Sequence, residues 1–163
     1  PLLADLQPVQ LSALMYLARC NRYSNTPLGV TDYLGLTKGT VSQSLKLLES
    51  KGLIVRKQDA RDKRSVHLQL TESAGTLLDA LLPPTFLVAG ETAMGERATV
   101  LKELLFELLR GIQQTNNVPG FGLCHSCRFH QKTGGQGFCN LTKEVLSEED
   151  SLLICREHQP PET

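Results

Sequence analysis

The chain of 163 residues is 40% hydrophobic and 21% charged, the composition of a globular protein, and its length allows one domain or a small domain with an extension. No apolar run approaches the ~18 residues needed to cross a bilayer, so we expect no membrane partner. The formal net charge of +0 argues against a protein that coats nucleic acid indiscriminately.

The first residues lack a basic leader followed by an apolar core, so no secretory signal is expected. The abrupt start is what a fragment without its natural first helix would show. Five cysteines are too few for a disulfide-dense secreted scaffold, which favours a cytoplasmic location under reducing conditions.

The first half of the chain predicts a helix-turn-helix. Apolar spacings of three and four predict a helix over residues 8–19, and a short helix over residues 28–34 follows a polar, turn-rich segment. After a break at Gly35, Thr37 is a good N-cap for a helix over residues 38–51. Two helices joined by a glycine-containing turn are typical of proteins whose second helix enters the DNA major groove.

Two short β-prone runs, residues 53–56 and 65–70, flank a polar tip at residues 57–64 and predict a hairpin with a charged end, the wing. Basic residues outnumber acidic ones around this hairpin although the whole chain is neutral. Between residues 38 and 64 the basic residues are Lys38, Lys46, Lys51, Arg56, Lys57, Arg61, Lys63 and Arg64, against Glu49, Asp59 and Asp62.

Helical patterns continue beyond the wing. One helix is predicted from Thr71 into the low eighties, where Pro83 and Pro84 interrupt the pattern, and a long helix is predicted to end near Gly111. Its wide apolar face carries Val100, Leu101, Leu104, Leu105, Leu108 and Leu109. A face this broad needs a partner, and a homodimer is the simplest explanation.

The polar face of the 38–51 helix is suited to a DNA groove, because glutamine and serine can hydrogen-bond base edges while lysines bind phosphates. That face consists of Lys38, Thr40, Ser42, Gln43, Ser44 and Lys46. At the wing tip, Arg61 and Arg64 are placed to enter the neighbouring minor groove. The competing interpretations are the ordinary polar face of an amphipathic helix and a solvated charged turn.

Three blocks in this order resemble the MarR family: LGLTKGTVS at 34–42, LLESKGLI at 47–54, and DARDKR at 59–64 continuing through Leu70-Thr71 and Gly75. The resemblance covers roughly residues 6–109. It implies a winged-helix dimer, held by its terminal helices, that binds a pseudo-palindromic operator in double-stranded DNA. It also implies that Arg64 enters the minor groove, that Asp62 orients Arg64, and that Thr40, Ser42, Gln43 and Lys46 lie on the groove-reading face. The family's first helix is missing here, and that helix normally contributes to dimerisation.

The last third of the chain contains a cysteine cluster. Cys124 and Cys127 form a C-x2-C knuckle, and Cys139 and Cys155 follow after eleven and fifteen intervening residues. Four thiolates suit an iron-sulfur cluster or a tetrahedral zinc ion, and the wide spacing leans slightly towards iron-sulfur. Free buried cysteines and redox disulfides remain alternatives, and a histidine such as His130 could replace a cysteine ligand.

The sequence therefore predicts a mainly α protein with a small β-wing (α+β). Its expected parts are a winged helix-turn-helix domain (1–82), a helical dimerisation region (83–115) and a cysteine-rich metal-binding extension (116–163). The favoured function is transcription regulation, in which a change in the cluster alters how the tail packs on the dimerisation helices. The alternative is a regulator with structural zinc and a small-molecule effector. An enzyme is not expected, because neither a glycine-rich phosphate loop nor paired carboxylates occur.

Overall fold

The computed structural model describes residues 6–60, 62–116 and 120–161. The helices are α1 (Pro8–Leu17), α2 (Pro27–Leu34), α3 (Lys38–Ser50), α4 (Glu72–Leu81), α5 (Thr85–Met94), α6 (Arg97–Thr115), the short 3-10 helix η2 (Cys124–Ser126) and α7 (Glu148–Leu152). The strands are β1 (Ile54–Gln58), β2 (Val66–Leu70), β3 (Gly122–Leu123), β4 (His130–Thr133), β5 (Gln136–Cys139), β6 (Glu144–Leu146) and β7 (Ile154–Cys155).

Helices α1, α2 and α3 form the predicted helix-turn-helix. The Thr26 side chain accepts a hydrogen bond from the Gly29 N–H at the start of α2, and Gly35 ends that helix in the left-handed region at φ 63. Thr37 caps α3, as predicted, by accepting from the Thr40 N–H at 3.2 Å. These caps hold α2 and α3 at the turn between them.

The apolar faces of these helices meet the wing in one core. Strands β1 and β2 pair in antiparallel register from Ile54↔Leu70 to Gln58↔Val66, which confirms the predicted hairpin. The buried core side chains are Ala13, Leu14, Tyr16, Leu17, Cys20, Val30, Val41, Leu45, Leu48, Leu53, Ile54, Leu68, Ala74, Leu78 and, from the tail, Ile154. Val41, Leu45 and Leu48 therefore form the inner face of α3, and the wing is anchored to the helix that is expected to contact DNA.

Two predictions for the middle of the chain were incomplete. Helix α5, which follows Pro84, was missed, and α6 continues through Gly111 to Thr115. A glycine inside a helix costs only about 1 kcal/mol relative to alanine. The Asn116 N–H still bonds the Ile112 carbonyl at 3.1 Å, so backbone bonding continues past the glycine.

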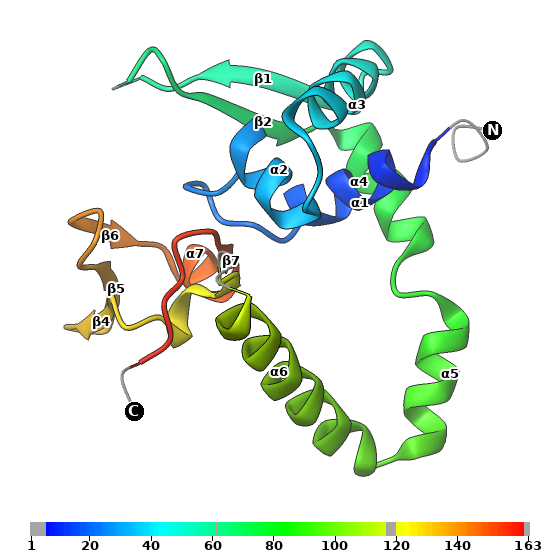
Figure 1. Cartoon of the computed structure of the whole chain (residues 1–163), viewed down its shortest axis with the longest axis vertical. Helices are drawn as coiled ribbons and strands as arrows, with labels where there is room; N and C mark the ends of the chain where they lie inside the picture. The colour runs from blue at the N-terminus through cyan, green and yellow to red at the C-terminus, as the bar shows by residue number, and fades with distance from the viewer. Residues whose placement is uncertain (1–5, 61, 117–119, 162–163) are drawn as a thin grey trace.

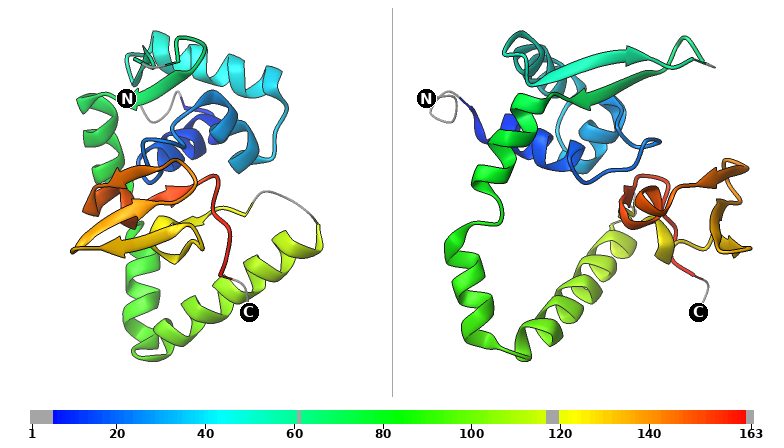
Figure 2. Two further views of the ribbon diagram at one scale, coloured as in Figure 1. Left: turned by 90° about the vertical axis from the view of Figure 1, so that its left-hand side faces the viewer. Right: turned by 180° about the vertical axis from the view of Figure 1, so that it is seen from behind.

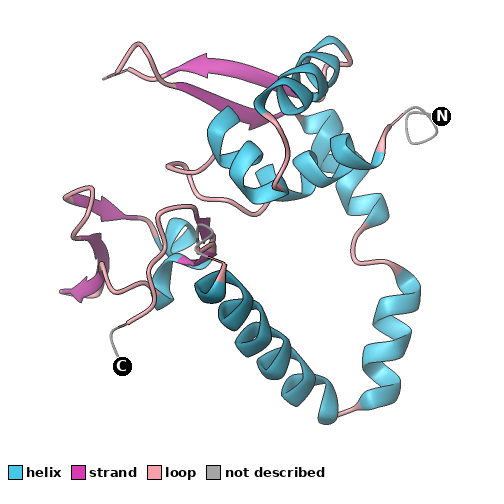
Figure 3. Cartoon of the chain, viewed as in Figure 1, coloured by secondary structure: helices cyan, strands magenta, loops and turns pink. Residues whose placement is uncertain are grey.

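The cysteine-rich tail (residues 120–161) folds as small pieces joined by loops, coloured by type in Figure 3. Strands β4, β5 and β6 form a three-stranded antiparallel sheet, and β3 pairs with β7. The tail also contains the short acidic helix α7, and its strands of two to four residues were not predicted. Strands this short contain too few residues to show an alternating pattern.

Helices α5 and α6 lead the chain away from the winged helix and back again, so the tail lies beside the loop between α1 and α2 (Figures 1 and 2). The apolar side chains of α5 and α6 are largely exposed, among them Phe86, Leu101, Leu104, Leu105, Leu108 and Ile112. Among the described residues no single helix is long and apolar enough to cross a membrane; only α4 and α5 taken together across a 46° bend match by length and composition.

Candidate DNA-binding surface and cysteine cluster

The predicted groove-reading face of α3 is open to solvent. Lys38, Thr40, Ser42, Gln43 and Lys46 are all exposed. Ser44, which the sequence placed on this face, is only 7% exposed, and its hydroxyl donates to the Thr40 carbonyl at 3.0 Å. Ser44 therefore lies on the core side of the helix with Val41 and Leu45, and it is not a candidate for DNA contact.

The wing tip presents an arginine held by an aspartate. Asp62 Oδ1 accepts from the Arg64 backbone N–H at 3.0 Å and from Arg64 Nε at 3.3 Å. These hydrogen bonds lower the pKa of Asp62, which therefore stays ionised at neutral pH. The Arg64 side chain is 94% exposed, available to a phosphate or a groove. Arg61, the other predicted wing contact, lies outside the described residues.

The base of the wing is tied to the loop between α1 and α2 (residues 18–26, the α1–α2 loop). The Asn25 carbonyl accepts from the Leu68 N–H at 2.7 Å, and Asn25 Oδ1 lies 2.5 Å from His67 Nδ1. The other ring nitrogen of His67 lies 3.0 Å from Asp59 Oδ2. Asp59 Oδ1 in turn accepts from the Asp62 N–H at 2.8 Å. A continuous set of polar contacts thus joins this loop to the wing tip.

The four tail cysteines come from separate elements and line one small cavity. Cys124 begins η2 and Cys127 follows it, while Cys139 ends β5 and Cys155 ends β7. Burial first, and then the neighbouring thiols of Cys155, Cys139 and Cys127, raise the pKa of Cys124 to about 12. Burial also raises the pKa of Cys155. The thiols of Cys124 and Cys155 therefore stay protonated at neutral pH unless a nearby cation stabilises their anions.

Asn21 supplies an unmatched donor at the same cavity. Its side chain is 0% exposed, and Oδ1 accepts from Ser24 Oγ at 2.8 Å and from the Tyr23 N–H at 3.2 Å. Nδ2 is buried and has no hydrogen-bond partner among the described residues, although it lies near enough to favour the Cys155 thiolate. A metal-bound thiolate or sulfide would accept from this amide. The sequence showed only a polar turn here, with no signal that Asn21 is buried.

The donor set fits a thiolate-bound metal centre, but the geometry is not closed around one ion. Within the described ranges, no three cysteine, histidine or acidic side chains are arranged to hold a metal ion. The cavity has a volume of about 30 Å³, which is roughly that of one water molecule. The space is that of one ion, while four thiols are donors that both a zinc ion and an iron-sulfur cluster accept.

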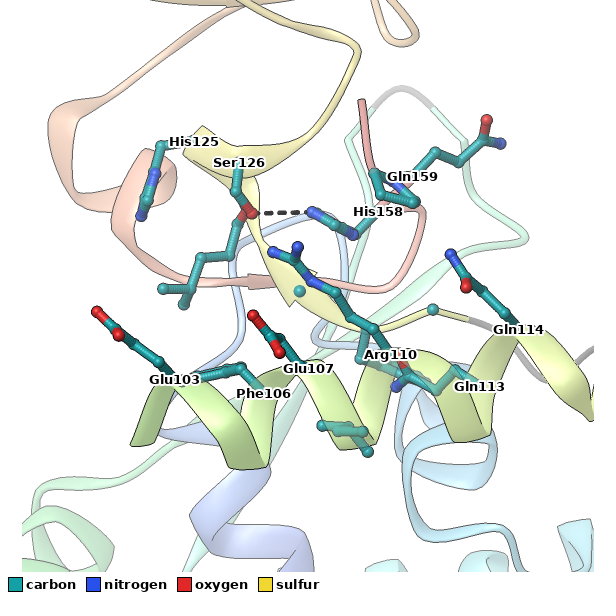
Figure 4. Close-up of a pocket in the computed structure, with 16 residues that line it drawn as sticks. Glu103, Phe106, Glu107, Arg110, Gln113, Gln114, His125, Ser126, His158 and Gln159 are labelled. Atoms are coloured by element: carbon teal, nitrogen blue, oxygen red, sulfur yellow. Dashed lines mark hydrogen bonds between the residues drawn. The ribbon is translucent and has the colours of Figure 1, made fainter. Parts of the chain in front are cut away.

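The histidines near the cysteines have other contacts. His158 is buried, and its Nε2 lies 3.0 Å from Ser126 Oγ inside the C-x2-C knuckle (dashed in Figure 4). His130 Nε2 lies 3.3 Å from Ser151 Oγ, while His125 is exposed. His158 is therefore hydrogen-bonded to the knuckle, whereas His130 lines the same cavity as the four cysteines, so its replacement of a cysteine ligand stays a prediction. Cys20 is buried elsewhere and its thiol points to the Leu17 carbonyl at 3.8 Å.

The tail is docked on the winged helix by several independent contacts. The Ile154 N–H donates to the Arg19 carbonyl at 2.8 Å, and its carbonyl accepts from the Asn21 N–H at 2.9 Å. Two ion pairs add to this, Arg156–Asp32 at 2.7 Å and Arg22–Asp150 at 2.9 Å. The Phe121 ring also lies edge-on to Tyr33, with ring centroids 5.1 Å apart.

A second, larger cavity of about 610 Å³ lies between α6 and the tail. Figure 4 shows Glu103, Glu107 and Arg110 of α6 on one side and Ser126 and His158 on the other. Its size falls within the range of small-molecule sites, roughly 300–1,000 Å³. The sequence did not predict this cavity, because α6 and the tail are brought together only by the fold.

Comparisons with known proteins agree with this geometry. A model described as MarR family matches residues 4–65. The organic hydroperoxide resistance transcriptional regulator of Bacillus subtilis (strain 168) is 33% identical over 116 residues, which cover 68% of this chain and 78% of that protein. The transcriptional repressor MprA of Escherichia coli (strain K12) is 33% identical over 72 residues, or 44% of this chain and 41% of MprA.

Solved structures give the same result. A mutant of MepR from S. aureus superimposes with a TM-score of 0.52 at 28% identity, covering 68% of this chain and 83% of that one. S. aureus MepR bound to ethidium bromide gives 0.50 at 28% identity, covering 67% and 80%. The chain therefore belongs to the MarR family, whose members are DNA-binding transcription regulators and not enzymes.

Proposed function

We propose that the protein is a dimeric regulator that binds a pseudo-palindromic operator in double-stranded DNA and senses redox or iron status through an iron-sulfur cluster. Cys124, Cys127, Cys139 and Cys155 would hold the cluster, which supplies reversible electron transfer and sensitivity to oxidants when bound. The observation that carries the sensor is the cavity where these thiols meet the unpartnered Asn21 amide. All five cysteines are free, in keeping with a reducing cytoplasm.

The DNA-binding part rests on the exposed face of α3 and on Arg64. Lysines and the wing arginine contribute phosphate attraction, while Thr40, Ser42 and Gln43 can bond base edges. We expect Arg64→Ala to abolish operator binding, measured by fluorescence anisotropy with a duplex selected from a random-sequence library. Glu72→Gln, a charge change at the start of α4 far from the wing tip, is the matched control. Unchanged affinity of the Arg64 variant would remove the wing from the interface.

The dimer rests on the apolar faces of α5 and α6. Side chains such as Leu104, Leu105 and Leu108 are 57%, 55% and 60% exposed, a patch larger than a soluble monomer normally leaves open. A second copy is the proposed partner, because two recognition helices suit two operator half-sites. Light scattering after size exclusion would give about twice the chain's 17.9 kDa.

In the second candidate function, the cysteines hold a structural zinc ion instead of an iron-sulfur sensor, and a small molecule is the effector. The 30 Å³ cavity has room for one ion, and the 610 Å³ cavity beside α6 has room for an effector. The similar protein MepR has been solved with ethidium bromide bound.

An ultraviolet-visible spectrum with iron, zinc and sulfide analysis of anaerobically purified protein separates the two candidates. Absorption near ~400 nm with stoichiometric iron and sulfide supports the sensor, because thiolate-to-iron charge transfer absorbs there. A colourless protein with one zinc per chain supports the structural zinc site. A protein that contains neither iron nor zinc removes the metal centre from the proposal.

A further inference from the structure

We propose that metal loading of the cysteine cluster controls the wing through the α1–α2 loop, so that the loaded protein binds DNA more tightly than the metal-free protein. This inference rests on the proposed function and names how its metal site regulates its DNA site. It differs from the expectation at the start, in which the tail acts on the dimerisation helices. The route instead runs within one chain, from Cys155 to Arg64.

Besides its docking contacts with the winged helix, where Ile154 enters the core and Phe121 and Leu123 pack against that core, the tail has little to hold it folded except its ligands. Among its described residues, Leu146 and Ile154 are the only buried hydrophobic side chains besides Cys124. Such a small apolar core does not offset the conformational entropy of ordering the segment, whereas metal ligation supplies folding free energy directly. The tail is therefore a two-state element, folded when the cysteines bind metal and loose when they do not.

Folding of the tail fixes the α1–α2 loop, because the residues before and after Cys155 are both hydrogen-bonded to that loop. Ile154 exchanges backbone hydrogen bonds with Arg19 and Asn21, and the Arg156 N–H donates to Ser24 Oγ at 2.9 Å. Arg156 Nε reaches Asp32 on α2 at 2.7 Å. Cys155, the last of the four cysteines, and the α1–α2 loop are therefore ordered together.

The loop in turn fixes the wing. Residue 25 follows directly on Ser24 and holds β2 by two contacts, its carbonyl to the Leu68 N–H and its side chain to His67. The second nitrogen of His67 reaches Asp59, which accepts from the Asp62 N–H, and Asp62 orients Arg64. A loose tail leaves this loop without its outer contacts and allows the wing to move, which weakens DNA binding.

The test compares loaded and chelator-treated protein, both anaerobic, in binding a duplex selected from a random-sequence library. We expect the loaded form to bind about 5- to 150-fold more tightly, the usual range of allosteric coupling. Ser24→Ala, which removes the hydroxyl that accepts from the Arg156 N–H at the tail–loop contact, and His67→Phe at the loop–wing contact should each reduce that ratio at least about twofold. Glu49→Gln, which removes an ion pair between α3 and Arg56 of the wing but leaves the loop intact, should keep it.

Hydrogen exchange gives a readout that does not depend on DNA. In the wild type, loading should slow exchange of the Asn21 and Leu68 amides together, since one bonds the tail and the other bonds the loop. The inference would be overturned if loading slowed exchange of the Asn21 amide alone. It would also be overturned if the loaded and metal-free forms bound DNA with equal affinity, and in both cases the DNA-binding function would stand. The inference would also be overturned if both variants, at the tail–loop contact and at the loop–wing contact, kept the wild-type ratio of loaded to metal-free affinity. If neither form binds any duplex, the proposed function itself fails.

Discussion

The winged helix and the cysteine tail are two regions of one chain that are stabilised by different means. The winged helix buries a shared core of apolar side chains from α1, α3, α4 and the hairpin, with Leu14, Leu45 and Leu48 at 0% exposure. The tail consists of short strands and turns around four thiols. The first gains stability from apolar burial, and we propose that the second gains it from bound metal. A protein built this way can lose one region without losing the other.

Metal removal is the sharpest test of that contrast and has the largest expected effect. Chelation should unfold the tail while leaving the winged helix folded, because bound metal can supply most of a small domain's folding free energy, ~10–16 kcal/mol for structural zinc in zinc-finger peptides. Hydrogen exchange followed by mass spectrometry would show protection lost over residues 120–161 and kept over α3. Cooperative loss of both regions would break the comparison.

A core truncation should have the reverse effect. Leu45→Ala removes a fully buried side chain from α3 and should lower the free energy of unfolding by about 2–5 kcal/mol. Metal stoichiometry per folded chain should stay as in the wild type, since Leu45 does not line the cysteine cavity. Leu47→Ala, at a 50% exposed position on the same helix, is the control in chemical denaturation. Equal losses for both variants would contradict the burial argument.

Asn21 lies where the two regions meet, and its removal should affect metal more than fold. Asn21→Ala deletes the buried Nδ2 donor beside the thiols, and outer-shell partners of metal ligands typically contribute 10–100-fold in affinity. Competition with a chromogenic chelator would measure the loss. Tyr23→Phe, at another residue that lines the cavity, removes a hydroxyl that bonds Glu144 and Arg22 but keeps the Asn21 amide, so it serves as the control. Metal affinity equal to the wild type would exclude Asn21 from the site.

The smallest effect is expected at the start of α3. Thr37→Ala removes the cap on the Thr40 N–H and should lower stability by about 1 kcal/mol, a usual value for a threonine N-cap. Thr37→Ser keeps the hydroxyl and should recover most of that loss in thermal unfolding. A loss of the same size in the serine variant would show that the cap is not the cause.

The winged helix was predictable because its signals are local. Three- and four-residue spacing marked α1 and α3, a glycine marked the turn, and two β-prone runs around a polar tip marked the hairpin. The missed features lie where local signals are weak. Helix α5 has no buried residue, Gly111 does not end α6, and Ser44 lies just beyond the polar face by rotation about the helix.

The sequence by itself determined the helix-turn-helix, the wing with Asp62 and Arg64, and the presence of four clustered cysteines. Only the tertiary structure decided that the tail docks on the α1–α2 loop, that Asn21 is buried beside the thiols, and that α6 borders a cavity. Hydrophobic periodicity and capping act over a few residues and can be seen in the sequence. Contacts such as Arg156–Asp32 join residues 124 positions apart, and they exist only because α5 and α6 return the chain to the winged helix.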